Sequence, residues 1–346
     1  MNGQGRKQNI GVFGSAFTLV GAVMGAGFIS GRELLDFFGG FYLFSVLLAG
    51  GCFFLCFYLF FCLGAKYGGF QGALQILPTF MQRAVRYGVL LGALFTSIGM
   101  LSAIRSALPL LNPVLPMAMV LLSVYIGEKG LGGLGKINGI LTPAILLAVL
   151  ILIWKNGSGS YPEKDLDAIG VVFPLFYVCL NAFFALPVLL DMGERFQANK
   201  RVSVCLLTSV TIAFFIGVIL CALASDKSSY SADLPLAAIL GSGKTAFSLL
   251  ACGGMATTLF SSFYPVYQTA KEMGGEWGKW GICLLMLLGS LIRFKKIVGV
   301  FYPLLSVIGV VVVIAFLLSG WIGKKEQGKE QGKELEKEIK IKIRKK

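Results

Sequence analysis

The segment from Gly21 to Glu33 (GAVMGAGFISGRE) places glycines and a carboxylic acid inside an apolar stretch. Four of its first eleven residues are glycine, and each glycine costs about 1 kcal/mol of helix stability relative to alanine. An interrupted helix frees N–H groups that suit a carboxylate and carbonyl groups that suit a cation. The alternative is that Gly21 and Gly25 allow close helix packing. The segment predicts either a binding site or a tight helix contact.

Charged residues follow these glycines directly. Arg32 and Asp36 are four positions apart, so they can pair on one face of a helix. Glu33 lies on a different face, and a charge inside an apolar span is rare unless it is paired or hydrated. We expect Glu33 to bind an amine or to take up a proton.

A second apolar stretch, residues 168–191, holds Pro174 and Pro187, with Asn181 between them. Proline interrupts helices because it lacks an N–H group. An amide without a partner is expensive to bury. We therefore expect Asn181 to contact a bound solute, with a hydrogen bond to a neighbouring helix as the alternative.

Three hydroxyl residues, Thr258, Ser261 and Ser262, have the spacing i, i+3, i+4. This spacing puts them on one face of a helix. Hydroxyl oxygens suit a small hard cation, so the three predict an ion-binding site, Na⁺ being the candidate. The alternative is that the hydroxyls bond back to carbonyls of their own helix.

The composition places all these residues in a membrane protein. The 346 residues are 56% hydrophobic and 14% charged, whereas a soluble domain carries about 25% charged residues. Apolar runs recur from residue 10 to residue 322 and are long enough to span a bilayer as helices. The net charge of +14 is concentrated in short loops and the C-terminal tail, which indicates the positive-inside rule and a lipid bilayer rather than nucleic acid as partner.

Several chemistries are disfavoured by the composition. Histidine is absent, and none of the eight cysteines forms a Cys-x-x-Cys pair. We expect no cofactor and no metal beyond Na⁺. We also expect no enzymatic activity, because no carboxylates cluster around a serine or cysteine nucleophile.

Ten membrane-spanning helices are predicted from the apolar runs. They cover residues 10–38, 41–63, 86–108, 113–127, 138–155, 168–191, 202–225, 245–270, 280–293 and 297–322.

Loop charges predict the orientation of these spans. Arg6 and Lys7 precede the first span and the tail is basic, so both termini are expected in the cytoplasm and the protein in the cell membrane. Glu163 and Asp165 fall on the outside in this arrangement, while the basic loop 293–296 does not fit it.

Ten spans divide into two sets of five, and an odd number in each half implies inverted topology. The expected organisation is a cytoplasmic N-terminus (1–9), a first five-helix repeat (10–156), a second (157–322) and a charged cytoplasmic tail (323–346). Each half opens with an interrupted span. Interruptions at corresponding positions are the best sequence indication of a transporter binding site.

The sequence VGAVMGAGFISGREL, followed by a Phe-Phe pair, resembles the YkvI-like bacterial membrane protein family, a distant branch of the amino acid–polyamine–organocation superfamily. The resemblance implies an all-α membrane fold of LeuT type, with a 5+5 inverted repeat whose first and sixth helices are broken.

The superfamily pattern also assigns residues by resemblance. Gly25, Ala26 and Gly27 match the stretch whose N–H groups hold a substrate carboxylate. Gly21 and Met24 match two carbonyl positions of a sodium site. That site is completed by the eighth helix, where Thr258, Ser261 and Ser262 are the candidates.

The function expected from these features is secondary active transport of a small zwitterion, an amino acid, by alternating access coupled to Na⁺ or H⁺. The alternative is a sensor on the same fold, similar to germinant receptors, that binds its ligand without moving it. The substrate, the coupling ion and the oligomeric state are left open by the sequence.

Overall fold

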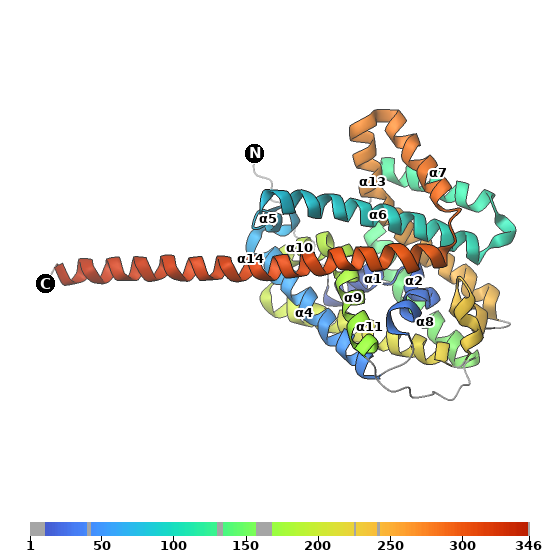
Figure 1. The fold of residues 1–346 in the computed structure, drawn as a ribbon, viewed down its shortest axis with the longest axis horizontal. Coiled ribbons are helices and arrows are strands. Elements are labelled where there is room, and N and C mark those ends of the chain that lie inside the picture. The colour runs from blue at the N-terminus through green and yellow to red at the C-terminus, as the bar shows by residue number, and fades with distance from the viewer. Residues whose placement is uncertain are drawn as a thin grey trace.

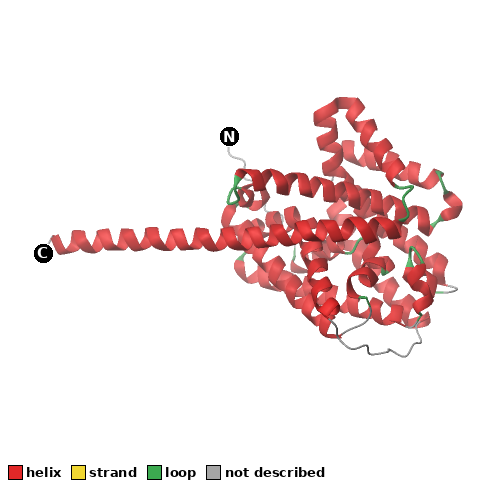
Figure 2. Cartoon of the chain, in the orientation of Figure 1, coloured by secondary structure: helices red, strands yellow, loops and turns green. Residues whose placement is uncertain are grey.

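The computed structural model describes residues 11–39, 43–129, 134–156, 168–224, 226–240 and 243–344. Within these ranges the chain is helical and contains no strand (Figure 2). The helices are α1 (Val12–Val23), α2 (Ala26–Ser30), α3 (Arg32–Phe38), α4 (Leu43–Tyr67), α5 (Gly69–Leu74), α6 (Thr79–Ala107), η1 (Pro109–Leu111), α7 (Val114–Lys129), α8 (Leu134–Asn156), α9 (Ala168–Phe184), α10 (Leu186–Arg195), α11 (Ala198–Ala224), η2 (Lys227–Ser231), α12 (Pro235–Ile239), α13 (Lys244–Gly289) and α14 (Phe294–Arg344).

Five of the described helices are long and apolar enough to cross a membrane. A sixth span is added if the bent pair α9 and α10 counts as one. The five helices are α4, α6, α11, α13 and the part of α14 up to Ser319. The chain is therefore an all-α membrane protein, as its composition predicts, and the bilayer surrounds its apolar helices.

Length and composition alone identify fewer spans than the ten that the sequence predicts, and the bounds of the helices show why. The first expected span is divided among α1, α2 and α3, and the apolar parts of α7 and α8 are short. The expected eighth and ninth spans lie together in α13, which is interrupted at Gly275 (φ 56°, ψ −137°).

The parts of the first span pack against helices from distant parts of the chain. α1 packs against α8 and α11, α2 against α13, and α3 against α9 and α14. The segments that the sequence predicts to be interrupted are thus the ones that the other helices surround.

Glycine allows α10 to pack closely against α4. The Cα atoms of Gly64 in α4 and Gly193 in α10 face the backbones of Leu190 and Phe61, with no room for a methyl group. Small residues of this kind let membrane helices approach each other closely. These contacts hold α10 against α4.

The expected tail, 323–346, continues α14 as helix to Arg344 and projects from the bundle (Figure 1). The expected N-terminal segment 1–9 and the acidic loop residues Glu163 and Asp165 lie outside the described residues.

Candidate functional site

The first span is broken at the place that its glycines predict. α1 ends at Met24 (φ −83°, ψ 66°), and Gly25 (φ −75°, ψ −169°) precedes α2 in an extended conformation. The first N–H groups of α2, from Ala26 to Phe28, have no acceptor within their own short helix. A second interruption follows at Gly31 (φ 79°), in the left-handed region that favours glycine.

The sixth expected span is also broken, one turn beyond Asn181. α9 ends at Phe184 and α10 begins at Leu186, with a bend of 64° between them. Pro187 stands in the first turn of α10, which its missing N–H group allows. Pro174 does not break α9 and lies inside the helix. Of the two prolines singled out by the sequence, only Pro187 adjoins the break.

A small cavity of ≈10 Å³ lies beside the break of the first span. This volume is about the least that one water molecule needs. Its lining comes from α1, α2, α8 and α13: Gly21, Met24, Ile29, Thr142, Ile145, Leu146, Gly254, Thr257 and Thr258. Three of the residues expected at an ion site, Gly21, Met24 and Thr258, therefore meet at one cavity.

Ser261 and Ser262 do not line this cavity. The Ser261 side chain is exposed, and its hydroxyl bonds to carbonyls of its own helix. The Ser262 hydroxyl is 2.8 Å from the Ser97 hydroxyl of α6. The polar face that does reach the cavity lies one turn earlier and consists of Gly254, Thr257 and Thr258, which have the same i, i+3, i+4 spacing.

Two hydroxyl residues of the cavity, Thr142 and Thr257, were not singled out from the sequence. The Thr142 hydroxyl lies 2.7 Å from where a Cβ atom on Gly21 would stand. The adjacent hydroxyls Thr257–Thr258 are a sequence signal that could have been used, whereas Thr142 is found only through the packing of α8 on α1. Both Thr257 and Thr258 donate to the Gly254 carbonyl at 3.0 Å, and each hydroxyl oxygen keeps acceptor capacity for a cation.

Glu33 lies on the other side of the same break. Its carboxyl group packs directly against the Cα atom of Gly27, where any larger residue would clash. The residue is 4% exposed. The carboxyl group interacts with the Tyr177 hydroxyl of α9 and with Tyr302 of α14. Glu33 therefore meets both broken spans, as its position after the glycines suggested.

The Tyr177 side chain is fully buried among the rings of Phe37, Phe38 and Phe53. Its hydroxyl faces Glu33 but forms no hydrogen bond of ordinary geometry. A buried hydroxyl in this condition costs about 1–3 kcal/mol. It is available to a ligand.

Asn181 is buried one turn after Tyr177. Its amide nitrogen donates to the Tyr177 carbonyl at 2.9 Å, within the same helix. This bond is not the expected alternative, a hydrogen bond to a neighbouring helix, and the contact of Asn181 with a solute stays a prediction. The amide also adjoins the Tyr177 hydroxyl, so Asn181 belongs to the polar cluster around Glu33.

Arg32 is directed at Asp36 and at the segment that contains Tyr230, not at Glu33. It pairs with Asp36, as expected, and donates to the Tyr230 carbonyl at 2.7 Å. Tyr230 belongs to η2, which is capped by Asp226. Hydrogen bonds from the hydroxyl and backbone N–H of Ser228 lower the pKa of Asp226.

The basic loop that did not fit the orientation rule adjoins the same segment. Arg293 is 3.4 Å from Asp233, which also accepts from Ser106 of α6. Asp233 and the basic loop therefore lie on the same side of the molecule, joined by the Arg293–Asp233 ion pair.

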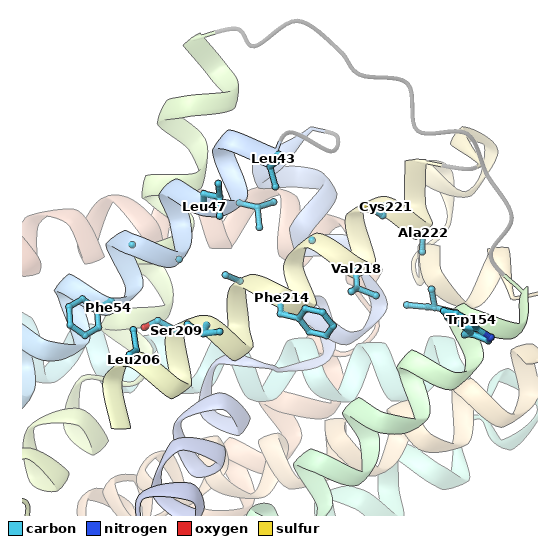
Figure 3. Close-up of a pocket in the computed structure, with 17 residues that line it drawn as sticks. Leu43, Leu47, Phe54, Trp154, Leu206, Ser209, Phe214, Val218, Cys221 and Ala222 are labelled. Carbon is cyan, nitrogen blue, oxygen red and sulfur yellow. The ribbon is translucent and has the colours of Figure 1, made fainter. Parts of the chain in front are cut away.

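A much larger hollow of ≈990 Å³ lies between α4, α11 and the end of α8 (Figure 3). Its walls are almost wholly apolar, with Phe54 and Phe214 along it and Trp154 at its far end. No charged residue lines it, and many of its side chains face outward. Lipid chains suit such a surface, so the polar break, not this groove, is the candidate site.

Comparison with known proteins supports the resemblance of the first span. The chain is 22% identical over 336 residues to the "Uncharacterized membrane protein YkvI" of Bacillus subtilis, a match that covers 87% of this chain and 94% of that protein. The expected similarity to YkvI is therefore confirmed across most of the chain. No family model matches.

Proposed function

We propose that the protein is a secondary active transporter in the cell membrane. It moves a small zwitterionic solute, an amino acid, by alternating access coupled to Na⁺ or H⁺. The observation that carries the proposal is the pair of broken spans. α1 breaks before α2 at Gly25, and α9 breaks before α10 at Ala185. The buried polar group Glu33 lies between the two spans.

Two interrupted spans are typical of the binding sites of transporters that work by alternating access. Irregular backbone at membrane depth is tolerated where it lines a cavity or faces protein. The free N–H groups at the start of the second half-helix suit a solute carboxylate, and the carbonyls at the end of the first suit a cation. The solute carboxylate would lie at Gly25, Ala26 and Gly27, where the Gly25 N–H donates to the Val23 carbonyl at 2.9 Å and the N–H groups of Ala26 and Gly27 have no acceptor within α2.

The fold proposed for this activity is the LeuT type with a 5+5 inverted repeat. Ten helical segments can be matched to it if α1–α3 and α9–α10 each form one span and α13 forms two, divided at Gly275. The first half then ends with α8 and the second begins with α9. Both termini are placed in the cytoplasm by the positive-inside rule.

The small cavity is proposed as the cation site. The carbonyls of Gly21 and Met24 and the hydroxyls of Thr142, Thr257 and Thr258 would supply oxygen ligands there. Na⁺ is a small hard cation, and its ligands are the carbonyl and hydroxyl oxygens that this cavity collects.

The test is uptake of a labelled amino acid panel into proteoliposomes, with an imposed Na⁺ gradient or pH gradient. Thr258→Ala is expected to abolish a Na⁺-driven component, whereas Ser261→Ala, a hydroxyl one turn away that faces outward, is the matched control and leaves it unchanged. Loss in both variants, or in neither, contradicts the cation site. Binding without uptake under either gradient contradicts transport and identifies a sensor instead.

A further inference from the structure

The Glu33 carboxyl group is buried without a cation to balance its charge. Among the described residues it forms no ion pair, and the adjacent Arg32 is turned to Asp36 and Tyr230. A bare carboxylate in such a place is costly, so it is retained only if a proton or another cation neutralises it.

The neighbours of Glu33 come from its own helix and from α2, α9 and α14. The titratable neighbours are Asp36 of its own helix, Tyr177 of α9 and Tyr302 of α14. From α2 it meets Gly27, and α11 presents the apolar Ile219 and Leu223 at the adjacent Gly31. Every titratable neighbour is neutral or negative, so the surroundings favour a bound cation over a bound anion.

The cluster also has unused hydrogen-bonding capacity. The Tyr177 hydroxyl is completely buried, faces the carboxyl group and forms no hydrogen bond of ordinary geometry. A ligand N–H group placed at Glu33 would have a second acceptor in this oxygen. An ammonium group at Glu33 would thus meet oxygens from both broken spans.

We propose that Glu33 is an exchange site at which the ammonium group of the solute replaces a proton. The protonated carboxyl group releases H⁺ to solvent as R–NH₃⁺ arrives, and the carboxylate then pairs with the ammonium ion. One positive charge thus always neutralises Glu33. This inference rests on the proposed function, since it names the group that recognises the solute amine and the way the proton is linked to it.

The experiment uses the full chain in nanodiscs, in weak buffer with a pH-sensitive dye, and three probes: ethylammonium, glycine and propionate. Ethylammonium and glycine are expected to release protons from the wild type, and propionate is not. While Glu33 is protonated, the affinity for ethylammonium should rise about tenfold for each pH unit, because one proton leaves per amine bound.

Glu33→Gln should bind no more tightly as pH rises and should release no protons. Glu272→Gln, an exposed carboxyl group on α13, is the matched control and should behave as the wild type. If Glu33→Gln does not fold, Glu33→Asp must keep proton release with weaker binding. In wild-type infrared difference spectra, ethylammonium must also convert a protonated carboxyl band to a carboxylate band.

Amine binding without proton release, proton release that persists in Glu33→Gln, or no binding of either amine at any pH overturns the inference. The proposed transport activity is judged separately. Uptake that keeps its pH dependence in Glu33→Gln refutes the exchange site and leaves transport standing. Proton release at Glu33 in a protein that moves no solute refutes transport and leaves the exchange site standing.

Discussion

Replacing Gly64 with alanine is expected to weaken the contact that holds α10 against α4. The added Cβ atom would overlap the carbonyl oxygen of Leu190. It would also lie 2.7 Å from the carbonyl carbon and 2.8 Å from the Cα atom of Leu190. Ordinary contacts begin at 3.4 Å, so the two backbones must separate by more than about 0.7 Å. The atoms met belong to the backbone, and no rotamer change can relieve the overlap.

The expected magnitude follows from two opposing effects. Overpacking costs about 1–3 kcal/mol, while alanine gains about 1 kcal/mol over glycine in a helix. Gly51→Ala, on the same helix with open space around it, receives the second effect without the first. Since both variants gain the same helix stability, Gly64→Ala should be less stable than Gly51→Ala by the overpacking cost alone, about 1–3 kcal/mol.

The assay is reversible unfolding of the purified chain in mixed micelles on titration with SDS. Gly193→Ala, whose Cβ atom would meet the Phe61 backbone from the opposite side, should show a loss of similar size. Equal stability of the Gly64→Ala and Gly51→Ala variants would refute the close contact, and with it the position of α10 after the break.

Three further predictions follow from single contacts. Gly31→Ala forces a left-handed conformation (φ 79°) on a residue with a side chain, and should lower the free energy of unfolding in mixed micelles by about 1–2 kcal/mol; an unchanged value would exclude this turn. Arg32→Gln removes a charged donor from the Tyr230 carbonyl, a bond worth about 1.5–3 kcal/mol, so hydrogen exchange in residues 226–231 should quicken at least about tenfold; unaltered protection would show that Arg32 does not hold this segment. A double-mutant cycle of Ser97→Ala and Ser262→Ala should give a coupling energy of about 0.6 kcal/mol in the same unfolding assay, because their hydroxyls link α6 to α13; additive effects would mean that this hydrogen bond is absent.

The break of the first span was predictable because glycine acts locally. Gly25 and Gly31 mark the two interruptions at which the helix stops, and no distant residue is needed to explain them. Pro187 likewise adjoins the second break. Pro174 was misleading, since a proline inside a membrane helix is tolerated when neighbouring helices support it.

The residues that line the small cavity could not all be predicted from the local sequence. The i, i+3, i+4 pattern of Thr258, Ser261 and Ser262 predicts an ion site on one face of α13, but that face extends over more than one turn of the helix. Which turn reaches the break depends on the packing of α13 against α2 and α8, and the structure brings Thr257 and Thr258 there instead of Ser261 and Ser262. Thr142 enters through the approach of α8 to Gly21, a contact between residues far apart in sequence.

The sequence by itself determined that this is an all-helical membrane protein with an interrupted first span, because hydropathy and glycine act on the chain around them. Only the tertiary structure decided that Glu33 lies on Gly27, that it faces Tyr177, and that Arg32 is directed elsewhere. The physical reason is that the role of a charged side chain in a membrane protein depends on the groups that it contacts. Those partners are supplied by helices that meet only after the bundle has packed.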